Sequence, residues 1–393
     1  MHDVIIASGV RTAIGDFGGA LKDVSALELG KIVILEALKR AGIDKEEVNE
    51  VIMGNVLPFG LGQNPGRQAM LMAGLPVDVG AITVNKVCGS GLKAVMLASQ
   101  AIALGDADIV VAGGMENMYQ VPYYLPQARG GYRLWDGKLV DGMVHDGLWD
   151  IIADCHMGVT AENVAVEFNV TRVDQDNFTL NSYTKAQKAM EAGEFKDEIV
   201  PVEIPQRKGP PVVFDSDEVP RRKTSLEALS LLSPAFKKDG TVTAGNSSKI
   251  SDGAAALVLM SGDRASKLGI KPLGRVVAHG SAGIDTNLVV AAPINSIPKI
   301  LKKAGLNIND IDVHEINEAF ASSTVAVIKK LGIDEKMVNI RGGAISLGHP
   351  IGCSGARVLV TLLNIMKDKK KKKGMASLCL GGGEAVSMIV ERL

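Results

Sequence analysis

Two cysteines flanked by glycines and one Gly-His-Pro segment are the residues of this sequence best suited to chemistry. Cys88 lies in NKVCGSGL, Cys379 in SLCLGGG and His349 in GGAISLGHPIGCSG. Glycine neighbours let a backbone and a substrate approach a sulfur atom that larger side chains would shield. Two thiols and an imidazole could then share the work, with one thiolate forming a covalent bond and the other groups moving protons.

Cys88 directly precedes a predicted helix that begins near Ser90. A helix N-terminus presents unpaired N–H groups and about half a positive charge. Such a setting lowers a cysteine pKa from about 8.5 into the range of roughly 3.5 to 7.5. The alternative is a small packed residue, because most free cysteines are buried. The position alone therefore allows a reactive thiolate or a core residue.

His349 and Cys379 each allow a catalytic and a structural reading. An imidazole on a glycine-rich loop could accept the thiol proton, and its N–H could hydrogen-bond a developing oxyanion. Alternatively, the ring of His349 could only form hydrogen bonds with backbone groups of the loop. Cys379 ends a predicted strand that leads into Gly381. It could be a thiol acid and base beside an oxyanion hole made by N–H groups of the glycine loop and of Cys88, or it could pack in the core.

Three other features are less decisive. Asn317 in INEAF could cap the next helix or hold a water molecule in an active site. We expect the lysine run 369–373 to be a solvated turn and Cys353 to be a packed bystander. Four cysteines without CxxC spacing predict neither a disulfide framework nor a zinc site.

The composition predicts an ordinary globular protein. The chain has 393 residues, 46% hydrophobic and 22% charged, with a formal net charge of −1. This balance gives no reason to expect nucleic acid or an anionic membrane as a partner. The N-terminal segment lacks the pattern of a secretory signal, no apolar run reaches the roughly 20 residues of a membrane span, and the C-terminal residues are not a peroxisomal tripeptide. We therefore expect a cytoplasmic protein.

Strand and helix patterns alternate in the first and last thirds of the chain. Strands are predicted at 4–6, 51–53, 109–112 and 376–380, and a further strand is predicted to begin at 311–313. Helices are predicted at 27–41, 92–104, 319–331 and 356–366, and a further helix is predicted to end at 300–304. This alternation favours a layered α/β fold with much parallel pairing.

A weak internal repeat suggests two copies of one unit. Ser90-Gly91 and Ser354-Gly355 each open a predicted helix that leads to a hydrophobic strand ending in glycines. Between the copies, residues 118–249 are rich in proline, aromatic and basic residues, with a predicted helix at 172–192. A long insertion on a rigid scaffold commonly carries substrate contacts.

Nine motifs follow one another along the chain: ASGVRTAIG, GNVLPFGLGQNPGRQ, NKVCGSGL, AGGMENM, CHMGVTAEN, TAGNSS, INEAF, NIRGGAISLGHPIGCSG and LCLGGG. In this order they resemble the thiolase family, most closely its biosynthetic type, over essentially the whole chain. The resemblance implies a five-layered αβαβα core built from two similar halves. It divides the chain into an N-terminal half (1–117 and 250–270), an inserted loop domain (118–249) and a C-terminal half (271–393).

The resemblance also assigns roles in a ping-pong condensation of two acetyl-CoA molecules to acetoacetyl-CoA and CoA. Cys88 matches the nucleophile that becomes acetylated, and His349 matches its base and an oxyanion-hole donor. Cys379 matches the residue that deprotonates the second acetyl-CoA. Asn317 matches the residue that holds the water of one oxyanion hole, and the N–H groups of Cys88 and Gly381 match the other hole.

For coenzyme A, the residues that match the family's binding path are Ser248, Arg221, His156, Met157, Leu148, Phe236 and Phe320. The resemblance implies no metal and no prosthetic group, only CoA thioesters as substrates. It implies dimers or, for the biosynthetic type, usually homotetramers built as dimers of dimers. Residues 123–141 match the region that makes the tetramer contacts.

The chain departs from the family pattern at three places. Residues 289–293 read Val-Val-Ala-Ala-Pro where the biosynthetic type commonly has Met-Gly-x-Gly-Pro, which adds bulk or restricts a loop near the pocket. Ala385 stands where glycine is common. Arg222 and Lys223 make the segment after Arg221 more basic than usual.

Four alternatives follow from the same motifs. A degradative 3-ketoacyl-CoA thiolase would take longer chains, but His156-Met157 is typical of the short-chain type. The 3-ketoacyl-ACP synthases use histidine or asparagine where this chain has Cys379. A non-catalytic acyl-CoA-binding scaffold would not need Cys88, Asn317, His349 and Cys379 together. A reversible Cys88–Cys379 disulfide could add redox sensing to catalysis.

Overall fold

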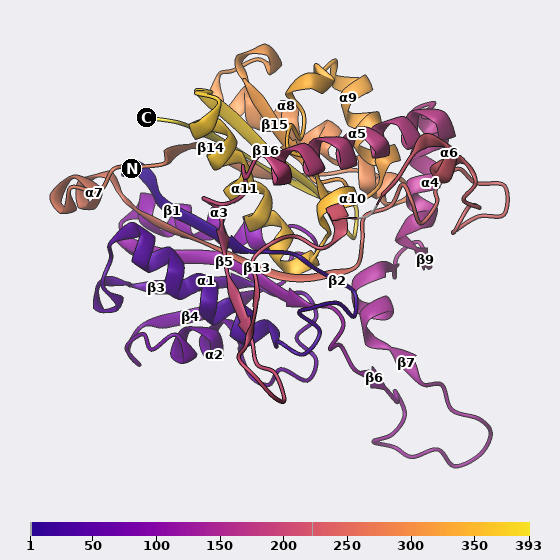
Figure 1. Cartoon of the computed structure of the whole chain (residues 1–393), viewed down its shortest axis with the longest axis horizontal. Helices are drawn as coiled ribbons and strands as arrows, with labels where there is room; N and C mark the ends of the chain where they lie inside the picture. Colours follow the sequence, from indigo (N-terminus) through magenta and orange to yellow (C-terminus); the bar gives the residue numbers. More distant parts are fainter. Residues whose placement is uncertain (1, 222) are drawn as a thin grey trace.

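A computed structural model describes residues 2–221 and 223–393 of the chain. Two groups of strands and helices form its core, and a long excursion is inserted within the first group, between β5 (Ile109–Asn117) and β13 (Ser251–Ser261) (Figure 1). The first group contains β1 (Val4–Thr12), α1 (Ala26–Ala41), β3 (Glu50–Gly54), α2 (Pro65–Met72), β4 (Gly80–Val84), α3 (Ser90–Leu104), β5 and β13. The second contains β14 (Gly274–Gly283), α8 (Pro293–Ala304), β15 (Val313–Ile316), α9 (Ala321–Leu331), α11 (Ile351–Asp368), β16 (Lys373–Leu380) and β17 (Glu384–Glu391).

The core has five layers of helix and sheet, αβαβα. Helices α1 and α2 cover the outer face of the first group of strands, and α8 and α9 cover the outer face of the second. Helices α3 and α11 lie between the two groups of strands and pack against each other. Along β5, Ile109 and Val111 face the outer layer while Val110 and Ala112 face the central one. Burial on both faces is why this strand reads as a continuous apolar run.

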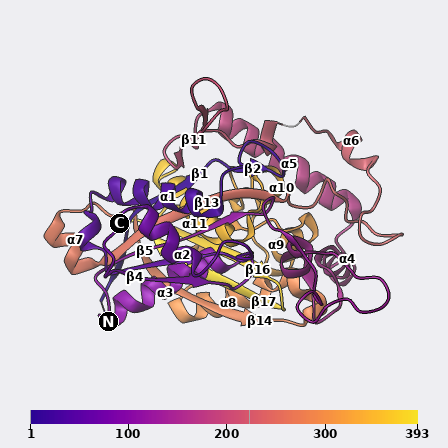
Figure 2. The same cartoon turned by 90° about the horizontal axis from the view of Figure 1, so that it is seen from below.

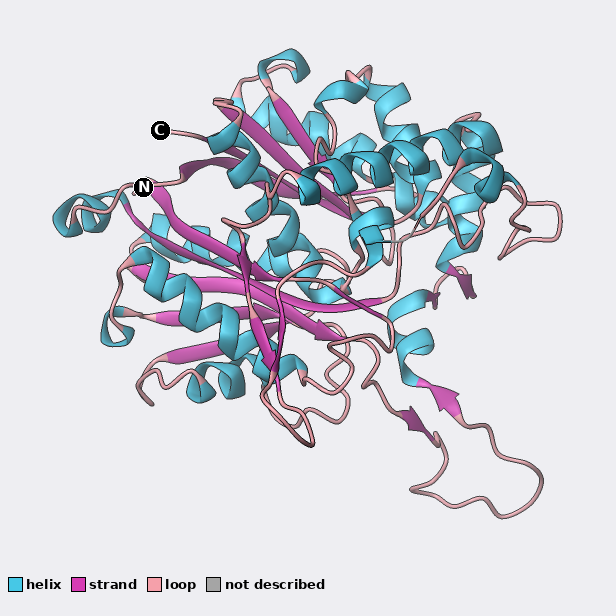
Figure 3. Cartoon of the chain, viewed as in Figure 1, coloured by secondary structure: helices cyan, strands magenta, loops and turns pink. Residues whose placement is uncertain are grey.

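The strands of both groups belong to one continuous eleven-stranded sheet. They are the long magenta arrows in the body of the molecule in Figure 3. The main path of the sheet runs β15-β16-β17-β14-β1-β13-β5-β3-β4, and the two groups meet where Ile5 and Ile6 of β1 pair with Arg275 and Gly274 of β14. Parallel pairs join β3 to β4 and β5, β15 to β16 and β1 to the short β10 (Ile199–Val200).

The prediction of much parallel pairing is therefore wrong for the middle of the sheet. Strands β1, β13, β14 and β17 pair with their main neighbours in antiparallel fashion. A tight glycine turn at 381–383 makes β16 and β17 a hairpin, and β13 returns to the sheet only after the long excursion. Antiparallel strands can be joined by a short turn, whereas parallel neighbours need a crossover.

Most predicted elements are present, with three shifted starts. Strand β15 begins at Val313 rather than at Ile311. Helix α9 begins at Ala321 rather than at Ala319, and α11 begins at Ile351, ahead of the predicted start. Two features explain the earlier start of α11. Pro350 occupies its N-cap, and the N–H of Gly352 in its first turn donates to the buried Glu116 carboxylate over 2.9 Å. A first turn whose free N–H groups find partners can extend into the preceding loop.

The excursion between β5 and β13 lies mainly at one end of the molecule, away from the two termini (Figures 1 and 2). Its helices α4 (Met157–Glu167) and α5 (Arg172–Glu191) pack against α9. A hairpin of β6 (Tyr123–Tyr124) and β7 (Val140–Asp141) extends out from the body, and its tip is exposed. The remaining short elements are β8 (Trp149–Asp150), β9 (Cys155–His156), β11 (Val202–Ile204), β12 (Val212–Phe214) and α6 (Leu226–Ser230).

One stretch of the described chain, Val87–Leu104, is long and apolar enough to cross a membrane by length and composition. It coincides with α3 and the loop before it, and 56% of it is buried inside the fold. The place of α3 between the two groups of strands accounts for its apolar composition.

Candidate active site

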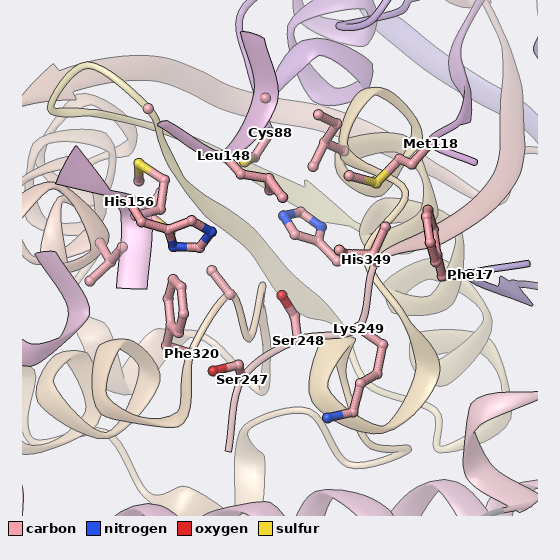
Figure 4. A pocket seen from close by; sticks show the side chains of 18 of the residues that line it. Phe17, Cys88, Met118, Leu148, His156, Ser247, Ser248, Lys249, Phe320 and His349 are labelled. Carbon is pink, nitrogen blue, oxygen red and sulfur yellow. The ribbon is translucent and has the colours of Figure 1, made fainter. Parts of the chain in front are cut away.

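A cavity of about 450 Å³ lies where the first half, the second half and the excursion meet. Figure 4 shows the imidazole of His349 pointing into its centre, with Cys88 and Leu148 close by and His156 and Phe320 at the side. Ten of the predicted site residues line it: Cys88, Leu148, His156, Met157, Phe236, Ser248, Phe320, His349, Cys379 and Gly381. Asn317 contacts His349 just behind the wall, whereas Arg221 is not among the lining residues.

The central helices bring together the two loops that carry Cys88 and His349. The N-terminal ends of α3 and α11 cross in direct backbone contact: a Cβ on Gly91 would lie 2.7 Å from the nitrogen of Ala356, and one on Gly355 would lie 2.3 Å from the nitrogen of Leu92. Only glycine fits such an approach. The two Ser-Gly pairs of the predicted repeat are therefore where the helices cross, and the loops before them meet at the cavity.

The loop that carries Cys88 is held in an unusual conformation. Val87 has a φ of 46°, which is strained for a β-branched residue. The Ser90 hydroxyl donates to the carbonyl of Val87 over 2.7 Å and accepts from the N–H of Lys86 over 2.8 Å. The ammonium of Lys86 also pairs with Glu384, which follows the glycine turn of the second half. These contacts fix where the Cys88 sulfur points.

Cys88 is a thiol in the resting protein. Enclosure in the cavity wall raises its pKa to about 12, and the nearby Glu116 carboxylate adds to this, although the N–H groups of Cys88 and Gly381 donate toward the sulfur and oppose the rise. The prediction of a pKa lowered by the helix N-terminus is thus wrong, because desolvation of the charged form exceeds the effect of those N–H groups. A base must take the proton before the sulfur can attack.

His349 is held at both ring nitrogens. Its Nδ1 lies 2.6 Å from the Ser354 hydroxyl, and its Nε2 lies 3.5 Å from the amide nitrogen of Asn317. Its backbone N–H donates to the carbonyl of Lys249 over 2.9 Å. Burial, helped by the positive charge of Arg357, lowers the pKa of the imidazole to about 3, so the ring is neutral. A neutral imidazole is the form that can accept a proton.

Cys379 is the last residue but one of β16 and is buried. Burial raises the pKa of its thiol, and proximity to the Cys88 sulfur raises it further. Gly382 and Gly383 follow with φ values of 84° and 83°, a conformation suited to glycine. Ala385, the second departure from the family pattern, lies directly opposite Cys379 on β17 and is fully buried.

Asn317 does not cap a helix. Helix α9 begins only at Ala321, after Phe320 at the N-cap. The backbone N–H of Asn317 donates to the carbonyl of Ser377, which ties it to β16, and its side chain is buried beside His349. Within the described part of the chain its Oδ1 has no hydrogen-bond partner. That oxygen is placed to accept from a group bound in the site.

Aromatic rings from separate segments form one side of the cavity. His156 stacks on Phe236 with the ring centroids 4.7 Å apart, and Phe236 meets Phe320 edge-on at 6.0 Å. The Nδ1 of His156 accepts from the N–H of Gly158 at the start of α4, which fixes the ring. A flat apolar wall of this kind suits a slender chain with a few polar groups.

Arg221 is exposed and donates to the carbonyl of Ser216 over 3.3 Å. The predicted contact between Arg221 and coenzyme A would therefore have to be made outside the cavity. Of the two basic residues that follow it, Arg222 lies outside the described residues, and Lys223 is exposed.

Sequence reasoning missed several wall residues: Phe17, Met118, Lys249, Val290 and Ile351. They come from strand ends, loops and the first turn of α11, where no periodic pattern marks a cavity wall. Val290 had a signal, since it lies in the 289–293 departure. The sequence also marked Ser354, because it belongs to the internal repeat. Only the fold shows that Ser354 contacts His349.

The chain belongs to the thiolase family. The family model "Thiolase, N-terminal domain" matches residues 4–263, and "Thiolase, C-terminal domain" matches residues 270–392. An acetyl-CoA acetyltransferase of Cupriavidus necator is 54% identical to it, and one of Pseudomonas aeruginosa is 52% identical; each match covers 100% of both chains. The crystal structure of the Bacillus anthracis acetyl-CoA acetyltransferase superposes with a TM-score of 0.98 at 45% identity, covering 100% of this chain and 99% of that one.

Proposed function

We propose that this protein is an acetyl-CoA C-acetyltransferase that reversibly condenses two acetyl-CoA molecules to acetoacetyl-CoA and CoA. The observation that carries the proposal is the meeting of two thiols, one neutral imidazole and two N–H groups in a single cavity. The full-length similarity to acetyl-CoA acetyltransferases supports the choice of substrate.

The first half-reaction is acetyl transfer to Cys88. The Nε2 of His349 accepts the thiol proton while the sulfur attacks the thioester carbon, and the departing CoA sulfur takes that proton to leave as the free thiol. Negative charge develops on the thioester oxygen during the attack. Two N–H groups, those of Cys88 and Gly381, already point toward the Cys88 sulfur and are placed to stabilise this oxygen.

The second half-reaction is carbon–carbon bond formation. Cys379, a thiol in the resting protein, gives its proton to the Nε2 of His349, and its thiolate then removes a methyl proton from the second acetyl-CoA. The resulting carbanion attacks the acetyl-Cys88 carbonyl, and the expelled Cys88 sulfur takes the proton held by His349. The enolate oxygen of the second acetyl-CoA faces the Nε2 of His349, which is protonated at this step, and a water held by Asn317. The buried, unpartnered Oδ1 of Asn317 supports that last role. Splitting the condensation into two steps lowers the barrier of each.

Coenzyme A enters along the aromatic side of the cavity in this proposal. Phe236, Phe320 and Leu148 provide apolar contact for the pantetheine chain, and His156, Met157 and Ser248 lie beside it. Arg221 lies outside the cavity, where the nucleotide phosphates would emerge. An exposed arginine suits a solvated phosphate because its planar fork can donate two hydrogen bonds.

The test is thiolysis of acetoacetyl-CoA by free CoA, beside a 3-ketoacyl-CoA with an eight-carbon chain and a Cys88→Ser control. Turnover of the short substrate alone, lost in Cys88→Ser, is the expected result. Preference for the longer substrate would move the protein to the degradative class. Absence of turnover with both would contradict the enzymatic proposal and favour an acyl-CoA-binding scaffold.

We also propose the assembly and surroundings of the enzyme. The exposed β6–β7 hairpin supports a homotetramer, because it holds large apolar side chains away from the body.

We propose a cytoplasmic location, catalysis without a metal or prosthetic group, and the domain division 1–117 with 250–270, 118–249 and 271–393. Redox sensing through Cys88 and Cys379 stays a prediction; all four cysteines are free thiols here.

A further inference from the structure

The Ser354 hydroxyl contacts a backbone carbonyl and an imidazole nitrogen. The carbonyl determines whether the hydroxyl donates a hydrogen bond to the imidazole or accepts one from it. The Ser354 Oγ lies 2.8 Å from the carbonyl oxygen of Pro350 and 2.6 Å from the Nδ1 of His349. All three residues are buried or enclosed at the start of α11. A carbonyl oxygen only accepts hydrogen bonds, so the single hydroxyl proton is committed to Pro350.

The hydroxyl must therefore accept from His349. With its proton directed to Pro350, the Ser354 oxygen presents a lone pair to Nδ1, which requires a proton on Nδ1. Because the ring is neutral, its other nitrogen then carries the lone pair. That nitrogen is Nε2, the one that contacts Asn317.

We propose that Ser354 is a positioning residue that selects the Nδ1-protonated tautomer of His349 and so keeps Nε2 free as the base for Cys88. This inference rests on the proposed function, because it assigns His349 the task of accepting the thiol proton. Without the hydroxyl acceptor, Nδ1 would lose its partner in a buried site. The Nε2-protonated tautomer, which cannot accept the thiol proton, would then gain population.

A serine also suits this site better than a carboxylate would. A carboxylate behind a histidine stabilises the imidazolium, as in the Ser-His-Asp triad. Here the positive charge of Arg357, on the same helix as Ser354, opposes a positive charge on the His349 ring. The Ser354 hydroxyl adds no negative charge that would offset this effect. The proton taken from Cys88 is thus held weakly and passes on to the departing CoA sulfur, which returns His349 to its neutral form.

The other half of the molecule contains a matching serine that supplies a control. Ser90, in the first turn of α3, likewise donates its hydroxyl proton to a loop carbonyl, that of Val87, and accepts from the N–H of Lys86. Both serines precede a glycine of the helix crossing. Each one thus fixes a catalytic loop through one donated and one accepted hydrogen bond, but only Ser354 contacts an imidazole.

The first experiment reads the tautomer directly in the resting enzyme. Protein labelled with 15N-histidine distinguishes the protonated from the lone-pair ring nitrogen by chemical shift, and a His349→Asn variant assigns the signal among the six histidines. We expect the Nδ1-protonated form in the wild type and in Ser90→Ala, and a large population of the Nε2-protonated form in Ser354→Ala. An Nε2-protonated wild type would overturn the proposal whether or not the enzyme makes acetoacetyl-CoA.

The second experiment measures the consequence for catalysis. In Ser354→Ala, kcat for acetoacetyl-CoA thiolysis should fall about 100-fold, the lower end of what a positioned general base contributes, with KM changed less than about twofold. Ser354→Thr retains the hydroxyl and should recover most of kcat. Wild-type kcat in a folded Ser354→Ala variant would refute the role. So would equal losses in Ser354→Ala and in a folded Ser354→Thr, since they would mean that packing and not the hydroxyl matters. A wild type inactive on every thioester would instead count against the proposed function.

Discussion

At the scale of single residues, the site is built from uncharged groups that become charged only during the reaction. Burial raises the pKa values of Cys88 and Cys379 and lowers that of His349. A preformed thiolate–imidazolium pair, as some cysteine enzymes have, would need the opposite shifts. Two thioester oxygens become negative in the proposed mechanism, and thiols that are neutral at rest add no negative charge beside them.

This arrangement predicts that the resting enzyme has no thiolate near neutral pH. With a pKa of about 12, the Cys88 sulfur stays protonated as the pH rises from about 6 to about 9 and ionises only above that window. The difference in ultraviolet thiolate absorbance between wild type and Cys88→Ser should therefore stay near zero across it. A constant thiolate signal from about pH 6 upward would show an ion pair with His349 and contradict the prediction.

The departure at 289–293 predicts how substrate length is limited. Val290 is buried and lines the cavity, whereas its neighbour Val289 is buried outside the wall. Val290→Gly should raise kcat/KM for a six-carbon 3-ketoacyl-CoA relative to acetoacetyl-CoA by about tenfold or more, since one methylene is worth about 1–3 kcal/mol in an apolar pocket. Val289→Ala is the matched control. An equal change of the ratio in both variants would mean that loosening of the loop, not space at Val290, sets the selectivity.

At the scale of elements, the crossing of α3 and α11 positions the chemistry. Cys88 precedes one helix and His349 the other, so the distance between the proposed nucleophile and the proposed base depends on how closely the N-terminal ends of the two helices approach. The Glu116 carboxylate adds a second link, because it accepts from the N–H groups of Val56 and Leu57 in the first half and of Gly352 in α11. The site thus depends on contacts between halves that lie far apart in the sequence.

Gly355→Ala tests this crossing. The new Cβ would lie 2.3 Å from the nitrogen of Leu92, so the helices must separate. We expect a loss of about 1–3 kcal/mol of stability, typical of overpacking, together with a loss of kcat because Cys88 and His349 move apart. Thermal unfolding and thiolysis rates measure the two effects. Gly80→Ala, where no atom lies within 4 Å of the added Cβ, should change neither. Unaltered stability and kcat in Gly355→Ala would show that the crossing tolerates a side chain.

At the scale of the whole molecule, one continuous sheet joins the two halves, while the excursion at 118–249 supplies the aromatic wall and the exposed hairpin. Leu134 and Trp135 between β6 and β7 are 78% and 88% exposed. Large apolar side chains held so far from the core favour contact with another protein surface. In our proposal that surface belongs to further copies of the chain.

Replacing residues 126–138 by a short Asn-Gly turn should convert the proposed tetramer to a dimer. The hairpin lies away from the cavity, so thiolysis per subunit should stay within about twofold of wild type, since surface changes away from the site alter folding little. Light scattering after size-exclusion chromatography measures the mass. A similar shortening of the β11–β12 turn serves as the control and should leave the tetramer intact. A tetramer that survives loss of the β6–β7 turn would place the assembly contacts elsewhere.

The sequence by itself determined the elements and the chemical groups. Hydrophobic periodicity predicted α1, α3, α5 and the buried strands, because these patterns are local, and the glycine-flanked motifs identified Cys88, His349 and Cys379 together with the family. The repeated Ser-Gly pairs indicated two related halves before any contact between them was known.

Only the tertiary structure decided the pairing, the protonation states and the neighbours. The antiparallel middle of the sheet depends on which strands meet after a long excursion, and no local pattern records that. The pKa of Cys88 depends on desolvation by residues distant in sequence, which exceeds the effect of the nearby helix end. The contact of Ser354 with His349 and the place of Val290 in the cavity wall likewise arise from packing, because interactions between side chains are fixed by where the chain brings them in space.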